Sequence, residues 1–369
     1  MGLLVACISM AATFDVNKTS ILVSDTVAND PLKIKQAFAQ IIANNSGENI
    51  VDVLRNPVFI GTNISQGIKR SYFEKVEAKY LAENGSPKFW FHVVADESFV
   101  QDLINEAGFS LLPHNRENVL LWLVKEEVES EVSDFSNQDA RDEARASLSP
   151  KLTYGFNDEI SMYWIKHWAQ ALGVALITPS MDEQDMLVVT PESIKNLSFQ
   201  AYEQTRNRYD MNYALLVYIK RTEGDIKIRS GFVMNQNDMS IKHFQEQMIN
   251  NSPTEEGELY YSVIHDVVEK YSNIFKIDRS DLEKHMVRLV VDKLDNYDQV
   301  YQVRKYFNKL SVIESFEIVA ASSGKLELNV NLSVTTAALL KIISNENVLN
   351  YNNNSPINQL IFSIIKPEQ

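Results

Sequence analysis

The spacing of apolar residues near the end of the chain predicts one small α/β module. Alternating, β-branched-rich segments predict strands, and apolar residues at helical spacing predict helices. The predicted strands are Met286–Leu294, Ile313–Ala320, Lys325–Val334 and Leu360–Lys366, and the predicted helices are Tyr297–Leu310 and Thr335–Ser344. This β-α-β-β-α-β order is that of a split, ferredoxin-like module, which we expect over residues 285–366.

A second α/β pattern covers residues 13–113. It predicts strands at Phe14–Val23, Ile68–Ala82 and Lys88–Ala95, and helices at Pro31–Asn44 and Asp96–Ala107. The segments Ile50–Leu54 and Phe59–Ile60, on either side of Pro57, are predicted to be irregular. Gly108 follows the last helical turn, where glycine commonly ends a helix.

Residues 118–277 form a longer middle module. The predicted strands are Val119–Val124, Ala175–Thr178, Tyr213–Lys220 and Asp225–Met234, the predicted helices are Glu159–Leu172, Ser193–Tyr209 and Leu259–Phe275, and Phe244–Asn250 is a strand or a short helix. The acidic, polar segment Val128–Ser149 indicates a solvent loop or a short exposed helix. Strands that alternate with helices favour a mostly parallel sheet with helices packed on it.

Length and charge limit the class of protein. A chain of 369 residues with 45% apolar residues is long enough for two or three domains with real cores. Together with the element pattern, this predicts an α+β fold of three small α/β modules. The net charge of −14 would repel duplex nucleic acid and anionic lipid, so we expect no nucleic-acid partner.

The first twelve residues have the composition of a short export signal. Residues 3–12 are apolar and end in small side chains, but the basic region that normally opens a secretory signal is absent. We therefore expect residues 1–12 to be a truncated signal segment and the protein to be periplasmic. A buried first strand is the alternative. Leu4–Cys7 also has the form of a lipobox, which would give a lipid anchor and peripheral membrane association. No other apolar run approaches the roughly 18–20 residues of a transmembrane helix.

Four stretches of the chain carry a family resemblance: Phe99–Gly108, Val119–Val124, Leu172–Pro179 with Asp182, and Tyr209–Tyr218. They are similar to a helix-Gly element, an apolar-Trp strand, a Gly-strand-Pro-x-x-Asp element and a buried strand. These belong to an uncharacterised proteobacterial envelope family, the domain of unknown function numbered two thousand and sixty-six. The chain has Tyr218 and Ile228 where that family usually has Gly and Trp. The resemblance implies an exported envelope protein and brings no catalytic residue.

Motifs for catalysis and metal binding are missing from the sequence. There is no His-Glu-x-x-His, Gly-x-Ser-x-Gly, Gly-x-Gly-x-x-Gly or Gly-Lys-Ser/Thr motif. The single cysteine, Cys7, excludes an internal disulfide and a Cys-rich metal site. His92 is expected on the polar side of its strand, opposite Phe91 and Val93, and His167 is expected to be packed or exposed. We therefore expect no catalytic residue, no cofactor and no metal ligand.

One acidic cluster is the best candidate for chemistry. Asp182, Glu183 and Asp185 follow the predicted strand Ala175–Thr178, and ligands of α/β sheets bind beyond the carboxyl ends of strands. Two carboxylates there could hold a cation or act as acid and base. The alternative is a set of carboxylates placed favourably at a helix N-terminus.

The expected function is non-catalytic protein–protein interaction with other envelope proteins. Edge strands accept a partner strand by β-augmentation, and Ile361–Ile365 is the predicted edge. One alternative is a metal-dependent hydrolase that uses Asp182 and Asp185. Another is a small-ligand or lipid-binding module, which predicts an apolar pocket in the middle module.

Overall fold

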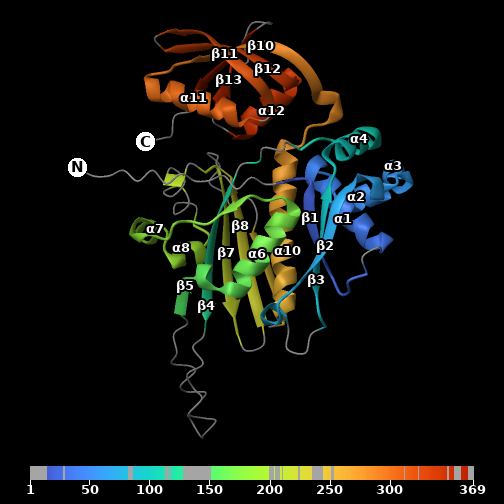
Figure 1. Ribbon diagram of the computed structural model, residues 1–369. Coiled ribbons are helices and arrows are strands. Elements are labelled where there is room, and N and C mark those ends of the chain that lie inside the picture. The colour runs from blue at the N-terminus through green and yellow to red at the C-terminus, as the bar shows by residue number, and fades with distance from the viewer. Residues whose placement is uncertain are drawn as a thin grey trace, which may run out of the picture.

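Three β-sheets with helices on their faces form the described part of the chain (Figure 1). The computed structural model describes residues 15–27, 30–81, 86–112, 116, 118–127, 151–198, 203, 208–209, 211–222, 225–234, 244–250, 253–310, 312–322, 324–346, 349–352 and 359–364. The predicted α+β class is confirmed. The predicted signal segment 1–12 and the polar segment Val128–Ser149 lie outside the described residues.

The first sheet is antiparallel, with strand order β1-β3-β2. Its elements are β1 Lys18–Val23, α1 Pro31–Ser46, α2 Ile50–Arg55, α3 Pro57–Gly61, η1 Ile64–Gly67, β2 Ile68–Lys75, η2 Ala78–Tyr80, β3 Phe89–Ala95 and α4 Glu97–Ala107. Gly108 ends α4 with φ 72°, as predicted. The segments predicted to be irregular are instead helices α2 and α3, because Asn49 and Asn56 cap their first turns through side-chain oxygens.

The second sheet has the order β5-β4-β7-β8-β9, with β6 paired to the start of β4. Its strands are β4 Val119–Glu127, β5 Lys151–Tyr154, β6 Leu176–Ile177, β7 Tyr213–Arg221, β8 Asp225–Met234 and β9 Phe244–Asn250. The β4–β7 and β4–β6 pairs are parallel, and the β4–β5, β7–β8 and β8–β9 pairs are antiparallel. The predicted mostly parallel sheet is therefore wrong, because β8 and β9 each pair antiparallel with the strand that precedes them in the chain.

The helices of the middle module are η3 Gly155–Asn157, α6 Glu159–Leu172, α7 Glu183–Val188, α8 Pro191–Lys195 and α10 Pro253–Phe275. Helix α6 has the predicted bounds, since Asp158 caps its first turn and Gly173 ends it with φ 84°. The predicted helix Ser193–Tyr209 is wrong over its first part. Helix α8 ends at Lys195, and Leu197 takes a left-handed φ of 52°.

Helices α6 and α10 lie side by side between the first and second sheets (Figure 1). Trp90 of β3 and Leu121 and Leu123 of β4 belong to the same core as these two helices. The opposite face of the second sheet, with Trp122, packs under the α7–α8 segment. The opposite face of the first sheet packs on α1 and α4. The order of layers is therefore helix, sheet, helix, sheet, helix.

The last sheet has the order β11-β12-β10-β14-β13. Its elements are η4 Arg279–Asp281, β10 Leu282–Asp292, α11 Tyr297–Lys309, β11 Ile313–Ser322, β12 Lys325–Val334, α12 Thr336–Glu346, β13 Leu349–Tyr351 and β14 Gln359–Ile364. The predicted strands and helices are present, and β13 is additional. Strand β14 lies between β10 and β13 and runs parallel to β10. The order is therefore β-α-β-β-α-β-β and departs from the predicted ferredoxin-like order by the inserted strand β13.

The predicted sheet edge Ile361–Ile365 is wrong for the residues described. Strand β14 pairs with β10 on one side and with β13 on the other, so Ile361 is an inner position. The edges of this sheet are β11 and β13. No helix within the described residues is both long and apolar enough to span a bilayer.

Candidate functional site

The acidic cluster predicted from sequence surrounds the start of α7. Asp182 caps this helix by accepting a hydrogen bond of 3.1 Å from the Asp185 backbone N–H. The guanidinium of Arg208 pairs with Asp182 and lies 3.1 Å from Asp185 Oδ1. The Tyr209 hydroxyl donates to Asp185 Oδ2, which also accepts from the Met181 backbone N–H at 2.9 Å. Glu183 is exposed and takes no part.

This arrangement favours a structural role for the cluster over a cation site. Hydrogen bonding to Arg208 lowers the pKa of Asp182 to about 2, so the carboxylate is charged and already paired. Asp185 is 1% exposed and is enclosed by Arg208 and Tyr209. Among the described residues, no three potential ligand side chains gather as a metal centre would require.

A line of three polar side chains crosses the first sheet and was not predicted. Ser20 Oγ lies 2.6 Å from His92 Nδ1, and His92 Nε2 lies 3.1 Å from Glu74 Oε2. The sheet register causes this, because Ser20 is opposite His92 on β3 and Tyr72 of β2 is opposite it on the other side. No sequence signal could have found it, since Ser20 and His92 are 72 residues apart.

The burial of Ser20 and His92 argues against nucleophilic catalysis by these three side chains. The residue types are those of a hydrolase triad, but Ser20 and His92 are each 5% exposed. Ser20 lies within a regular strand, and neither residue lines the cavities described below. Burial lowers the pKa of His92 below 6.5, with Glu74 opposing the shift. We therefore assign the line to the packing between the first sheet and α6.

His92 faces away from Phe91 and Val93, as predicted, but its side of the strand is covered rather than polar. The neighbouring Trp90 stacks on His167 of α6, with ring centroids 5.2 Å apart. His167 is therefore a packed histidine. Trp164 and Trp168 are buried in the same core.

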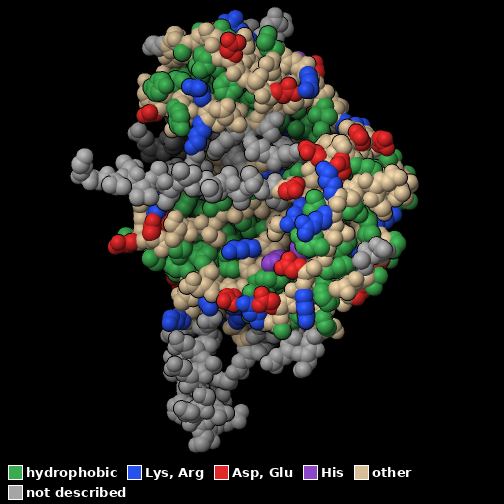
Figure 2. Space-filling model, in the orientation of Figure 1, with side chains coloured by type: hydrophobic (Ala, Val, Ile, Leu, Met, Phe, Trp, Pro, Cys, Tyr) green, Lys and Arg blue, Asp and Glu red, His purple; other side chains and the backbone are tan. Residues whose placement is uncertain are grey.

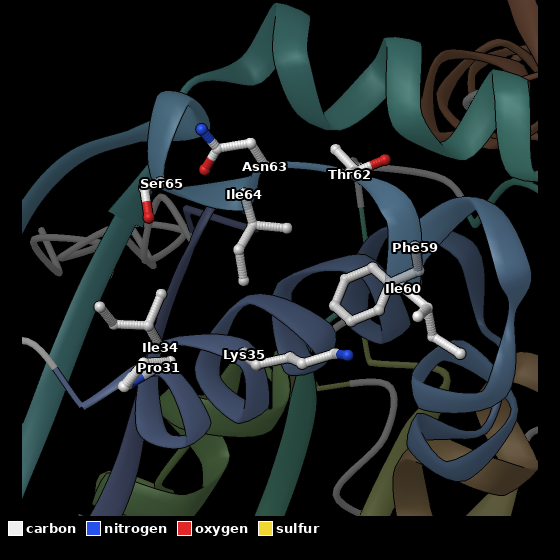
Figure 3. Close-up of a pocket in the computed structure, with 9 residues that line it drawn as sticks. All are labelled: Pro31, Ile34, Lys35, Phe59, Ile60, Thr62, Asn63, Ile64 and Ser65. Carbon is white, nitrogen blue, oxygen red and sulfur yellow. The ribbon is translucent and has the colours of Figure 1, made fainter.

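One groove large enough for a small molecule lies in the first module. This groove of about 380 Å³ opens between α1, α3 and η1 (Figure 3). A cavity near Arg116 in the middle module holds only about 10 Å³, which is too small for a ligand. In Figure 3 the side chain of Lys35 extends below the ring of Phe59 toward Ile60. The groove is lined by apolar and polar side chains, namely Pro31, Ile34, Phe59, Ile60 and Ile64 together with Lys35, Thr62, Asn63 and Ser65.

The last module offers an open sheet edge at β11. This strand has ten residues and pairs with β12, and no other described strand pairs with it. Eight of its ten residues are exposed, including the apolar Ile318 and Val319 at 39% and 48%. A register irregularity leaves Val319 without an opposite residue on β12. The sequence had indicated this strand but not its edge position.

Basic and acidic side chains are interspersed on the face shown in Figure 2, without a continuous basic surface. The fold and these sites together define the class of protein only as a three-sheet α+β protein with one groove and one open strand edge. A scan of protein-family models and searches of curated proteins and solved structures each found no match. The resemblance to the envelope family stays a prediction.

Proposed function

We propose that this protein acts without catalysis, by accepting an extended segment of a partner protein on the outer side of β11. The observation that carries the proposal is the length and exposure of this edge strand. Main-chain N–H and C=O groups on the unpaired side of an edge strand can continue the hydrogen-bond ladder with an added strand. The exposed side chains of Ile318 and Val319 would supply apolar contacts beside that ladder.

The sequence of β11 lacks the lysine and proline that often block an edge, although the strand has two register irregularities. Native edges are commonly protected by lysine, by proline or by very short strands. Residues 313–322 contain no Lys, Arg or Pro. The edge strand β2 of the first sheet, by contrast, carries Lys69, Arg70 and Lys75, and β13 has only three residues. Strand β11 is therefore the edge best suited to β-augmentation among these three.

The proposed setting is the bacterial envelope. The apolar residues 3–12 and the family resemblance support export, and neither depends on the described structure. Cell fractionation tests this part of the proposal. We expect the chain in the periplasmic fraction or, when Cys7 is lipidated, in the membrane fraction. Recovery of the uncleaved chain in the cytosol would contradict it.

Site-specific photocrosslinking in intact cells tests the docking edge. Benzoylphenylalanine at Glu317 should give one reproducible adduct, and the same probe at Tyr301 of α11, which is 59% exposed, should not. Adding Val319→Lys should remove the Glu317 adduct, because a lysine on the edge disfavours strand addition. Equal adducts from both positions, or none from β11, would overturn the proposal.

A further inference from the structure

The groove between α1, α3 and η1 has the size of a small-molecule site. Its volume of about 380 Å³ lies within the roughly 300–1,000 Å³ that is common for ligand pockets. Pro31 and Ile34 lie at one end, and Phe59 and Ile60 lie at the other (Figure 3). Thr62, Asn63 and Ser65 line the rest of the groove, so its wall is apolar at these two ends and polar along η1.

One positive charge, that of Lys35, lies in this groove. The Lys35 amine is 5.8 Å from the centre of the Phe59 ring. In the described part of the chain, no carboxylate lies within 4 Å of that amine. Lys33 differs, because it is buried and pairs with Asp25 and Asp30. Although the net charge is −14, charges more than about 8 Å away are largely screened at physiological ionic strength. The Lys35 amine therefore favours a ligand with a negatively charged head group.

We propose that this groove binds a free medium-chain fatty acid. Lys35 pairs with the carboxylate, and Pro31, Ile34 and Ile60 contact the alkyl chain above the buried Phe59 and Ile64. A single cation beside apolar side chains is complementary to one anionic head group on one apolar tail. Each methylene that becomes fully buried raises affinity by about fourfold, so decanoate should bind more tightly than octanoate. The proposal is independent of the docking edge on β11, which belongs to another module.

Calorimetric titration of the full chain with octanoate, decanoate and the neutral octanol tests the groove. Lys35→Met should weaken decanoate binding by about tenfold, the order expected of one charge-assisted contact, and should leave octanol binding within twofold. Ile60→Asp should weaken decanoate binding as well, because it places a negative charge in the groove. Ile60 is 55% exposed, so this variant should keep the fold.

A matched control is Lys284→Met, which removes a lysine whose side chain is 79% exposed on the last module. Its decanoate affinity should equal that of the unchanged protein. The proposal is overturned when Lys35→Met leaves decanoate affinity within twofold, or when octanol binds as tightly as octanoate. A third outcome would also overturn the proposal. If the protein binds anionic vesicles through Lys35 but does not bind free decanoate, the groove contacts a lipid surface.

Discussion

The Thr19 hydroxyl on β1 donates a hydrogen bond of 2.7 Å to the backbone carbonyl of Ala171 in the last turn of α6. The two residues are 152 positions apart. Asn44 Nδ2 of α1 donates to the same carbonyl at 2.9 Å. The last carbonyls of a helix have no partner within the helix, so the first module caps the end of a helix that belongs to the second sheet.

Because Thr19 and Asn44 donate to the same carbonyl, we expect the effects of substituting them on stability to be coupled. Thr19→Val should cost about 1 kcal/mol of unfolding free energy, because Asn44 still satisfies Ala171. The double variant with Asn44→Leu should cost more than the sum of the single changes, since a buried carbonyl then loses both donors. Urea unfolding of the single and double variants measures the difference. Additive costs would show that the two hydrogen bonds act independently.

A second prediction concerns the close contact of α10 with α6. Gly257 lies in α10, and a Cβ there would be 2.7 Å from Trp164 Cδ2. Gly to Ala inside a helix normally stabilises by up to about 1 kcal/mol. Gly257→Ala should instead destabilise by about 1–3 kcal/mol, because the buried indole ring has little room to move.

The matched control is Gly61→Ala, at the end of α3. A Cβ at Gly61 meets no atom within 4 Å, so this variant should keep or slightly raise the melting temperature. Thermal unfolding followed by circular dichroism compares the two variants. A higher melting temperature for Gly257→Ala would contradict the close packing of α10 on Trp164.

Local signals explain which parts of the fold could be predicted. The bounds of α6 follow from the Asp158 cap and from Gly173, both visible in the sequence. The spacing of apolar residues did not predict α2 and α3, although Asn56 followed by Pro57 is a recognisable helix start. Because α3 lines the groove, the groove was missed with it.

Long-range pairing explains the remaining errors. Strand direction in the second sheet depends on how β7, β8 and β9 pair, which the alternation of strands and helices does not determine. The line from Ser20 through His92 exists only because β1 and β3 are neighbours in the sheet. The acidic cluster was found from sequence, but its partners Arg208 and Tyr209 lie more than twenty residues later.

The buried His92 should make stability fall as the pH drops below neutral. Burial lowers its pKa in the folded chain below 6.5, so the folded state favours the neutral ring. The stability that neutral His92 contributes is present above pH 6.5 and is lost as the pH falls toward the pKa of His92 in the folded chain. His92→Gln should be less stable at pH 7.5 and should lose less stability between pH 7 and pH 5. Parallel curves for the two proteins would show that His92 does not titrate with folding.

Glu126 should have a separate effect on folding stability, at lower pH. Burial alone would raise the pKa of this carboxyl, but hydrogen bonds from Lys195, Lys220 and Tyr218 lower it from 4.5 to about 2. Because the pKa of Glu126 is lower in the folded chain than in the unfolded chain, its contribution to stability is present above pH 4.5. This contribution is lost as the pH falls toward 2. Glu126→Gln should flatten acid unfolding below pH 4.5 and leave the interval from pH 7 to pH 5 unchanged. Flattening of the higher interval as well would contradict this assignment.

The strongest single effect should come from Arg221, at the end of β7. Its guanidinium lies 2.5 Å from Glu256 Oε1 and also pairs with Asp158, whose side chain is 7% exposed. Arg221→Met leaves two buried carboxylates without their cation, which should cost about 3–5 kcal/mol in urea unfolding. Lys284→Met breaks the exposed pair with Glu314 and should cost less than about 1 kcal/mol. Adding Asp158→Asn and Glu256→Gln to Arg221→Met should recover part of the loss, because the uncompensated charges are removed. If stability does not recover, the loss comes from packing of the arginine side chain and not from unpaired charge.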